Sequence, residues 1–190
     1  FRAELLRRIL GLNGHMAVYS IDHKPLKEFE DLAVKISLMV GVTRVIPTVE
    51  GQVLLSANKV AGGAIVRGIR PADIKARKII SENIKSGTLE NFHRKNSVIV
   101  GKRLALKFGV GPGDKLRLVS PQSNQTAFGS VPRSKIYKVT AVFDVGMFEY
   151  DSGFVFMPLE AAQIYFRSKG AVTNIEVFLS DPDQVPIVRT

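Results

Sequence analysis

The sequence contains no cysteine and only three histidines, and these two shortages narrow the chemistry open to it. Without cysteine, the chain has no disulfide framework, no thiolate nucleophile and no thiolate metal ligand. The histidines, His15, His23 and His93, do not stand at a spacing that brings two ligands onto one helical face. We therefore expect a non-catalytic domain with no metal or cofactor site, and the lack of thiols suits an oxidising compartment.

Long apolar runs are also missing. No stretch reaches the roughly 18 apolar residues that a membrane helix needs, and no secretory signal is visible. Positive charge is plentiful instead, with 27 Lys and Arg against 17 acidic residues and a formal net charge of +10. This excess suits an anionic partner such as nucleic acid, an anionic membrane surface or an acidic protein.

Both ends of the chain look internal to a longer protein. Phe1, Leu5 and Ile9 lie on one stripe of an expected helix that has no capping residue ahead of it. At the other end, the sequence stops at Thr190 without a terminating signal. We therefore expect the chain to be a portion of a larger polypeptide.

Hydrophobic periodicity and turn residues predict an α+β fold. The expected helices cover 1–10, 25–40, 70–84, 98–108 and 159–167. The expected strands cover 15–20, 43–50, 52–57, 60–69, 115–119, 136–143, 153–157 and 172–179, with a loop at 144–152. This order predicts an α/β subdomain made of residues 1–90 together with 153–190, and an inserted β-rich subdomain at 91–152.

Residues 120–135 form the most distinctive stretch. They join two strand-like flanks and are far longer than an ordinary hairpin connection. Pro121 and Pro132 cannot donate ladder hydrogen bonds, so we expect a loop between them. That loop is polar and uncharged around Phe128. Two interpretations stay open: the loop inserts its apolar tip into a partner, or Phe128 folds back onto the domain.

Basic residues flank this loop. Arg117 precedes it, and Arg133 and Lys135 follow it. We expect Arg117 to face the other two across the hairpin, where their mutual repulsion favours an outside anionic partner. A solvated basic face without a partner is the alternative.

Other candidate sites have less support as functional sites. The glycines at 109, 111 and 113 follow an expected helix and precede a strand, the reverse of a phosphate-binding loop, so they turn the chain. Asp144, Glu149 and Asp151 read as surface acids. Residues 109–118 are similar to the strand-turn pattern of AbrB-type regulators, which leaves a basic DNA-binding protein as an alternative of a different class.

Six segments occur in order along essentially the whole chain: 1–15, 51–56, 66–69, 99–105, 113–114 and 149–152. As a set they resemble the periplasmic domain of the LolC/LolE family, the permeases of lipoprotein-releasing ABC transporters. The resemblance implies a MacB-like periplasmic core with a long protruding β-hairpin. It also implies an inner-membrane parent protein with this domain in the periplasm.

The family further implies a set of partners. These are a soluble LolA-like lipoprotein carrier, a LolD-like ATPase subunit that hydrolyses ATP, a second permease copy or LolE-like subunit, and the lipoprotein cargo, with no nucleic acid. A macrolide-exporter or cell-division permease, with other periplasmic partners, is the alternative within the superfamily.

In the LolC type, a hairpin hook enters the carrier and a basic and polar pad lies at its base. The resemblance maps the hook onto Pro121, Thr126, Ala127, Phe128, Gly129, Val131 and Pro132. It maps the pad onto Arg117, Arg133, Ser134 and Lys135. The chain departs from the family pattern at Ala127, where proline is often found, and at Ser134-Lys135, which replaces a glutamine-arginine pair.

Overall fold

The computed structural model describes residues 12–22, 24–126 and 129–181, and for 121–131 it describes the backbone alone. The strands are β1 (Met16–Val18), β2 (Leu26–Lys27), β3 (Val42–Ala57), β4 (Val60–Ile69), β5 (Ile84–Gly87), β6 (Ser97–Gly101), β7 (Lys115–Thr126), β8 (Gly129–Phe143), β9 (Phe154–Pro158), β10 (Ala171–Val172) and β11 (Asn174–Leu179). The helices are α2 (Phe29–Ser37), α3 (Pro71–Ala76), α4 (Lys78–Ser81), the 3-10 turn η1 (Glu90–His93), α5 (Lys102–Phe108), α6 (Phe148–Gly153) and α7 (Leu159–Tyr165).

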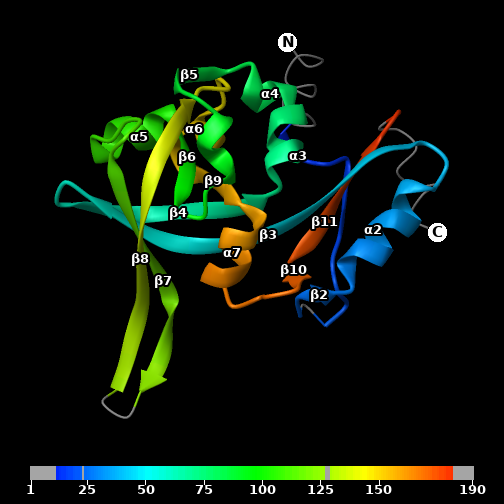
Figure 1. Cartoon of the computed structure of the whole chain (residues 1–190), viewed down its shortest axis with the longest axis horizontal. Coiled ribbons are helices and arrows are strands. Elements are labelled where there is room, and N and C mark those ends of the chain that lie inside the picture. Colours follow the sequence, from blue (N-terminus) through cyan, green and yellow to red (C-terminus); the bar gives the residue numbers. More distant parts are fainter. Residues whose placement is uncertain (1–11, 23, 127–128, 182–190) are drawn as a thin grey trace.

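Nine of these strands form one mixed sheet in the described part of the chain (Figure 1). Its order is β1-β11-β3-β4-β9-β6-β8-β5, and β7 pairs with both β3 and β8. The β4–β9 and β6–β8 pairs are parallel and the others are antiparallel. The long strand β3 links the two halves, because residues 42–48 pair with β11 and residues 49–57 pair with β4.

The central strands are buried on both faces. Along β9, Val155 and Met157 belong to one hydrophobic cluster, whereas Phe154 and Phe156 belong to another. Since successive side chains of a strand point to opposite faces, the two clusters are the two sides of the sheet. Helices cover both sides: α2, α5 and α7 contribute to the first cluster, and α3, α4 and η1 to the second.

The α+β class and the protruding hairpin agree with the prediction, and the division at residues 90 and 152 stays a prediction. Several local predictions were wrong. The expected helix 98–108 begins as strand β6, whose five residues are all buried between β8 and β9. The hydroxyl of Ser97, the first residue of β6, donates backwards to the carbonyls of Phe92 and Arg94.

The predicted break between strands 43–50 and 52–57 was also wrong. Strand β3 is continuous there, with Gly51 opposite Val66 on β4. A Cβ atom at this position would lie 2.4 Å from the ring of Phe166, so the glycine permits close packing of that ring on the strand. The predicted loop 144–152 contains helix α6, and the predicted helix 25–40 is shortened to α2 with β2 ahead of it.

The predicted strands 52–57 and 60–69 are joined directly, and the chain turns as expected at Gly109. Asn58 and Lys59 have positive φ angles and join β3 to β4, as a tight hairpin turn requires. Gly109, with φ 61°, ends α5 in the left-handed conformation. Across the described ranges, no helix is both long enough and apolar enough to span a bilayer.

Candidate functional site

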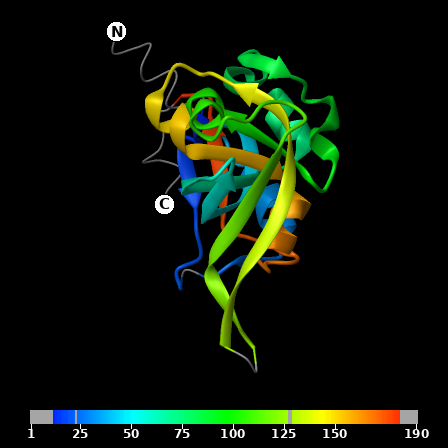
Figure 2. The same ribbon diagram turned by 90° about the vertical axis from the view of Figure 1, so that its left-hand side faces the viewer.

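The β7–β8 hairpin projects well beyond the rest of the molecule (Figures 1 and 2). Its ladder runs from the Lys115–Lys138 pair to the Thr126–Gly129 pair. Near its base, β7 also pairs with β3, through Leu118 opposite Leu55. The base is therefore held between two strands of the sheet, whereas the described residues beyond it have strand partners only within the hairpin.

The backbone corrects the expectation of a long loop. Strand pairing continues past both prolines, and Pro132 stands opposite Ser123. The register shifts between Val119 and Ser123, a bulge that contains Pro121. Proline has no N–H to donate to a ladder hydrogen bond. A bulge accommodates it, because a bulged residue is not required to make that bond. The result is a two-stranded ribbon that carries its tip away from the sheet.

The predicted hook residues are described only in part. The backbone of Pro121, Thr126, Gly129, Val131 and Pro132 lies in the two strands of the ribbon. Ala127 and Phe128 lie outside the described residues. The tip interaction assigned to them stays a prediction.

The predicted pad is divided by the pleat of the hairpin. Arg117 is exposed, and its Nη1 donates to Ser134 Oγ at 3.1 Å. Lys135 stands opposite the buried Leu118, so it lies on the other face of the hairpin. The expectation that Arg117 faces Lys135 was therefore wrong, because successive residues of a strand point to opposite faces and Lys135 shares its face with Leu118, the neighbour of Arg117.

The two basic residues on the other face have partners within the domain. Arg133 Nη1 donates to the carbonyl of Tyr165 at the end of α7. The Lys135 ammonium lies 5.1 Å from the ring centroid of Tyr137. Burial raises the pKa of the Tyr165 phenol to about 12. The Arg133 bond ties the hairpin base to α7, and Lys135 packs along its own strand, which leaves Arg117 and Ser134 as the exposed part of the pad.

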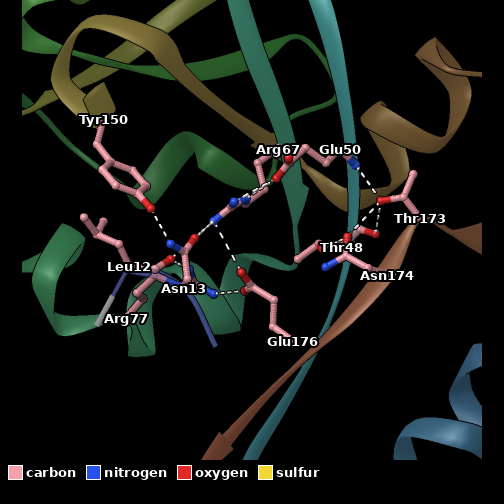
Figure 3. Close-up of polar contacts among 10 residues, drawn as sticks. All are labelled: Leu12, Asn13, Thr48, Glu50, Arg67, Arg77, Tyr150, Thr173, Asn174 and Glu176. Carbon is pink, nitrogen blue, oxygen red and sulfur yellow. Dashed lines mark hydrogen bonds and ion pairs between the residues drawn. The ribbon is translucent and has the colours of Figure 1, made fainter. Parts of the chain in front are cut away.

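A second group of polar side chains lies buried around strands β4 and β11 (Figure 3). Sequence reasoning missed it. Glu176 on β11 accepts from two guanidinium groups: Arg77 Nη2 contacts its Oε2, and Arg67 Nη1 lies 3.3 Å from its Oε1. Arg67 also pairs with Glu50, with 2.7 Å between Nη2 and Oε2. The side chains of Arg77 and Glu176 are 1% and 5% exposed.

The same two arginines hold the N-terminal segment of the described chain. Arg67 Nη1 donates to the Leu12 carbonyl at 3.3 Å and to Asn13 Oδ1 at 3.2 Å. Arg77 donates to the Leu12 carbonyl as well, and Asn13 Nδ2 donates to the Tyr150 hydroxyl. We call Arg67, Arg77 and Glu176 the buried charge cluster. It joins residues 12–13 to strands β4 and β11 and to α3.

Burial is costly for these charges. It lowers the pKa of the Arg77 guanidinium, and the carboxylate of Glu176 opposes that shift. The Arg77 guanidinium also lies 5.5 Å from the ring centroid of Phe178. The Arg67 guanidinium lies 5.0 Å from the ring centroid of Phe154. The sequence held one hint, since Glu176 is the one charged residue of β11.

The carboxylates of the 144–151 segment have structural roles. Asp144 accepts from Lys102 Nζ at 2.9 Å, and this contact lowers its pKa. Asp151 is buried, which raises its pKa, and it accepts from the backbone N–H of Val145 at 2.9 Å. Asp151 is therefore not the surface acid that the sequence indicated. The described residues contain no group of three potential metal ligands.

Residues 9–190 match the sequence family described as the MacB-like periplasmic core domain. The chain belongs to that family. Among curated proteins it is similar to the lipoprotein-releasing system transmembrane protein LolC of Xylella fastidiosa, at 28% identity over 96% of this chain and 44% of that protein. LolC of Neisseria meningitidis is 25% identical over 98% of this chain and 45% of that protein. The chain thus spans less than half the length of these relatives.

Solved structures show the same MacB-like core fold. The periplasmic region of MacB from Actinobacillus actinomycetemcomitans has a TM-score of 0.59 at 14% identity, covering 98% of this chain and 84% of that one. The extracellular domain of the ABC-type transporter YknZ from Gram-positive bacteria has a TM-score of 0.57 at 16% identity, covering 86% and 78%. The expected MacB-like periplasmic core is confirmed, and the similarity to LolC proteins extends over nearly all of this chain.

Proposed function

We propose that this MacB-like core domain is the periplasmic part of an inner-membrane ABC-transporter permease that releases lipoproteins. In this proposal, the domain passes cargo to a soluble, LolA-like carrier, and a separate LolD-like subunit hydrolyses ATP. The permease pairs with a second copy of itself or with a LolE-like subunit. The similarity to two LolC proteins over nearly all of this chain supports the proposal.

One observation carries the docking role: the β7–β8 ribbon extends beyond the sheet from a base that is fixed on two sides. A rigid base lets the tip enter a cavity with little loss of conformational freedom on binding. Phe128 is the only aromatic residue between positions 120 and 135. A carrier of acyl chains offers an apolar cavity, and an aromatic anchor is a frequent centre of binding energy.

Arg117 is the pad residue best suited to meet the carrier. It is exposed, and its one described partner is the neutral hydroxyl of Ser134. Arg133 instead attaches the hairpin to α7, and Lys135 lies over Tyr137 of its own strand. We assign carrier contact to the hook and to Arg117 with Ser134, and a supporting role to the other two.

The test is calorimetric titration of the chain with a purified LolA-like carrier. In the main variant, Asn-Gly replaces residues 124–131, so that the Ser123–Pro132 pair is closed by a two-residue turn. Binding by the parent and its loss in this variant, with an unchanged unfolding midpoint, is the expected result. If the parent does not bind, the carrier role is wrong and an exporter-type or cell-division-type permease becomes the leading interpretation.

Point variants sharpen this test. Phe128→Asp should abolish binding, whereas Phe148→Asp should not, because Phe148 is an exposed aromatic on α6 outside the hairpin. Arg117→Ala should weaken binding about fivefold to tenfold, as expected for an interface arginine worth about 1 kcal/mol. Arg133→Ala should lower stability while the affinity of the folded protein stays the same. Equal losses for both phenylalanine variants would contradict the hook.

A further inference from the structure

The end of helix α2 and the turn that follows it expose a run of apolar side chains. Val34, Leu38 and Val40 are 59%, 80% and 94% exposed, and Met39 is exposed as well. Val34 and Leu38 stand four residues apart and so share one face of the helix end. The opposite face of α2 packs Phe29 and Ile36 into the core. We call Val34, Leu38, Met39 and Val40 the apolar corner.

The apolar corner adjoins both the first and the last described segments of the chain. The backbone N–H of Ser180, just after β11, donates to the carbonyl of Gly41 at 2.8 Å. The backbone N–H of Leu179 donates to His15 Nδ1 at 2.9 Å, which brings the start of β1 to the same end of β11. His15 and residues 179–181 therefore lie at the same end of β11, next to the exposed turn, whereas Leu12 lies deeper, beside Arg77.

This corner and the hairpin lie at different ends of the molecule. The arrowhead of β11 and the turn after α2 lie at the upper right of Figure 1, whereas the projecting ends of β7 and β8 lie at the lower left. The proposed function attaches the domain to membrane-spanning segments of the same polypeptide. Because the last described residues of the chain reach this corner, the hairpin then points away from the bilayer and toward the periplasm.

We propose, on the basis of that function, that the apolar corner rests in the bilayer surface of the membrane that anchors the protein. Exposed aliphatic side chains on a short helix end are suited to the boundary between lipid headgroups and acyl chains. Basic side chains next to them complement anionic headgroups: Lys35 lies in the last turn of α2, and Arg44 is exposed at the start of β3. The contact fixes the orientation of the domain over the membrane.

The absence of tryptophan from the sequence allows a clean test with a single introduced probe. Leu38→Trp places the probe in the apolar corner. Leu106→Trp is the matched control, because Leu106 is similarly exposed at 73% but lies on α5, far from α2 in Figure 1. Each variant is tethered through a C-terminal histidine tag to phosphatidylethanolamine–phosphatidylglycerol vesicles that contain a small fraction of nickel-chelating lipid.

In the Leu38→Trp variant, we expect the indole emission to shift to the blue on tethering and to be quenched by brominated acyl chains. The emission of the Leu106→Trp control should stay unchanged. Emission from the Leu38→Trp variant that keeps its solvent value on tethered vesicles would overturn the proposal. A shift that grows with tether density and is not quenched by brominated lipid would also overturn it, and would assign the corner to a second copy of the chain. Carrier titration in lipid-free solution is independent of this result, so failure of the carrier role and failure of the membrane contact are distinguishable.

Discussion

Replacing Glu176 with glutamine removes the carboxylate that the two arginines of the buried charge cluster share, while nearly keeping its size. Arg67 retains Glu50 as an ionic partner, but Arg77 loses the carboxylate with which it pairs. The guanidinium of Arg77 is then left charged and buried, with the carbonyl of Leu12 and the ring of Phe178 as its remaining described contacts. The substitution should therefore destabilise the fold strongly.

The expected magnitude follows from the burial of the pair. Removing one partner of a buried ion pair costs about 3–5 kcal/mol, and the amide oxygen of glutamine can still accept one hydrogen bond. We therefore expect a loss of about 3 kcal/mol in the free energy of unfolding. For a chain of this size, each kcal/mol corresponds to about 2–4 °C, so the melting temperature should fall by about 6–12 °C.

Urea denaturation followed by circular dichroism measures this loss, with Glu50→Gln as the matched control. Glu50 contacts the same Arg67, but its side chain is 36% exposed, so solvent screens the change and the loss should stay below about 1 kcal/mol. The reasoning would be refuted if Glu176→Gln cost no more than Glu50→Gln. Such a result would mean that Arg77 finds compensation without its carboxylate.

Two further predictions concern packing and pH. Gly68→Ala should lower the free energy of unfolding by about 1–3 kcal/mol, because the new Cβ would lie 2.2 Å from the Cβ of Ala162 on α7. Gly63→Ala, whose Cβ would have no atom within 4 Å, should be neutral or slightly stabilising. Equal urea midpoints for the two variants would contradict the close helix–sheet contact. Burial lowers the pKa of His15, so the unfolded chain binds a proton more readily and the His15 contribution to stability is lost as the pH falls below about 6.5. Between pH 7 and pH 5, the urea midpoint should therefore fall less in His15→Asn than in the parent. The asparagine side-chain oxygen can still accept a hydrogen bond from the N–H of Leu179. The same fall of the midpoint in both proteins would rule out a role for this imidazole.

Several features were readable from local sequence because local chemistry alone decides them. Asn58-Lys59 turned out to be a tight turn, since asparagine tolerates the left-handed conformation that such a turn needs. Gly109 ends α5 for the same kind of reason. Strand β4 follows the apolar and β-branched run of residues 60–69.

Elsewhere the tertiary partners decided. A short apolar run such as 98–100 is compatible with a helix or a strand, and only its position between β8 and β9 made it β6. The prolines at 121 and 132 indicated a loop. Instead, Pro121 lies in a bulge, and Pro132 occupies a paired position in the ribbon. In both cases the neighbouring strands supply hydrogen bonds that the local sequence does not reveal.

The sequence by itself determined the α+β class, the family and the existence of a long hairpin, because these follow from periodicity, segment order and strand-forming flanks. Only the tertiary structure divided the pad between two faces of the hairpin, since the strand register sets which side chains are opposed. It alone brought Arg67, Arg77 and Glu176 together, from positions far apart in the sequence, around the carbonyl of Leu12. The pairing of buried charges depends on which strands are neighbours in the sheet, and the positions of residues along the chain do not predict those neighbours.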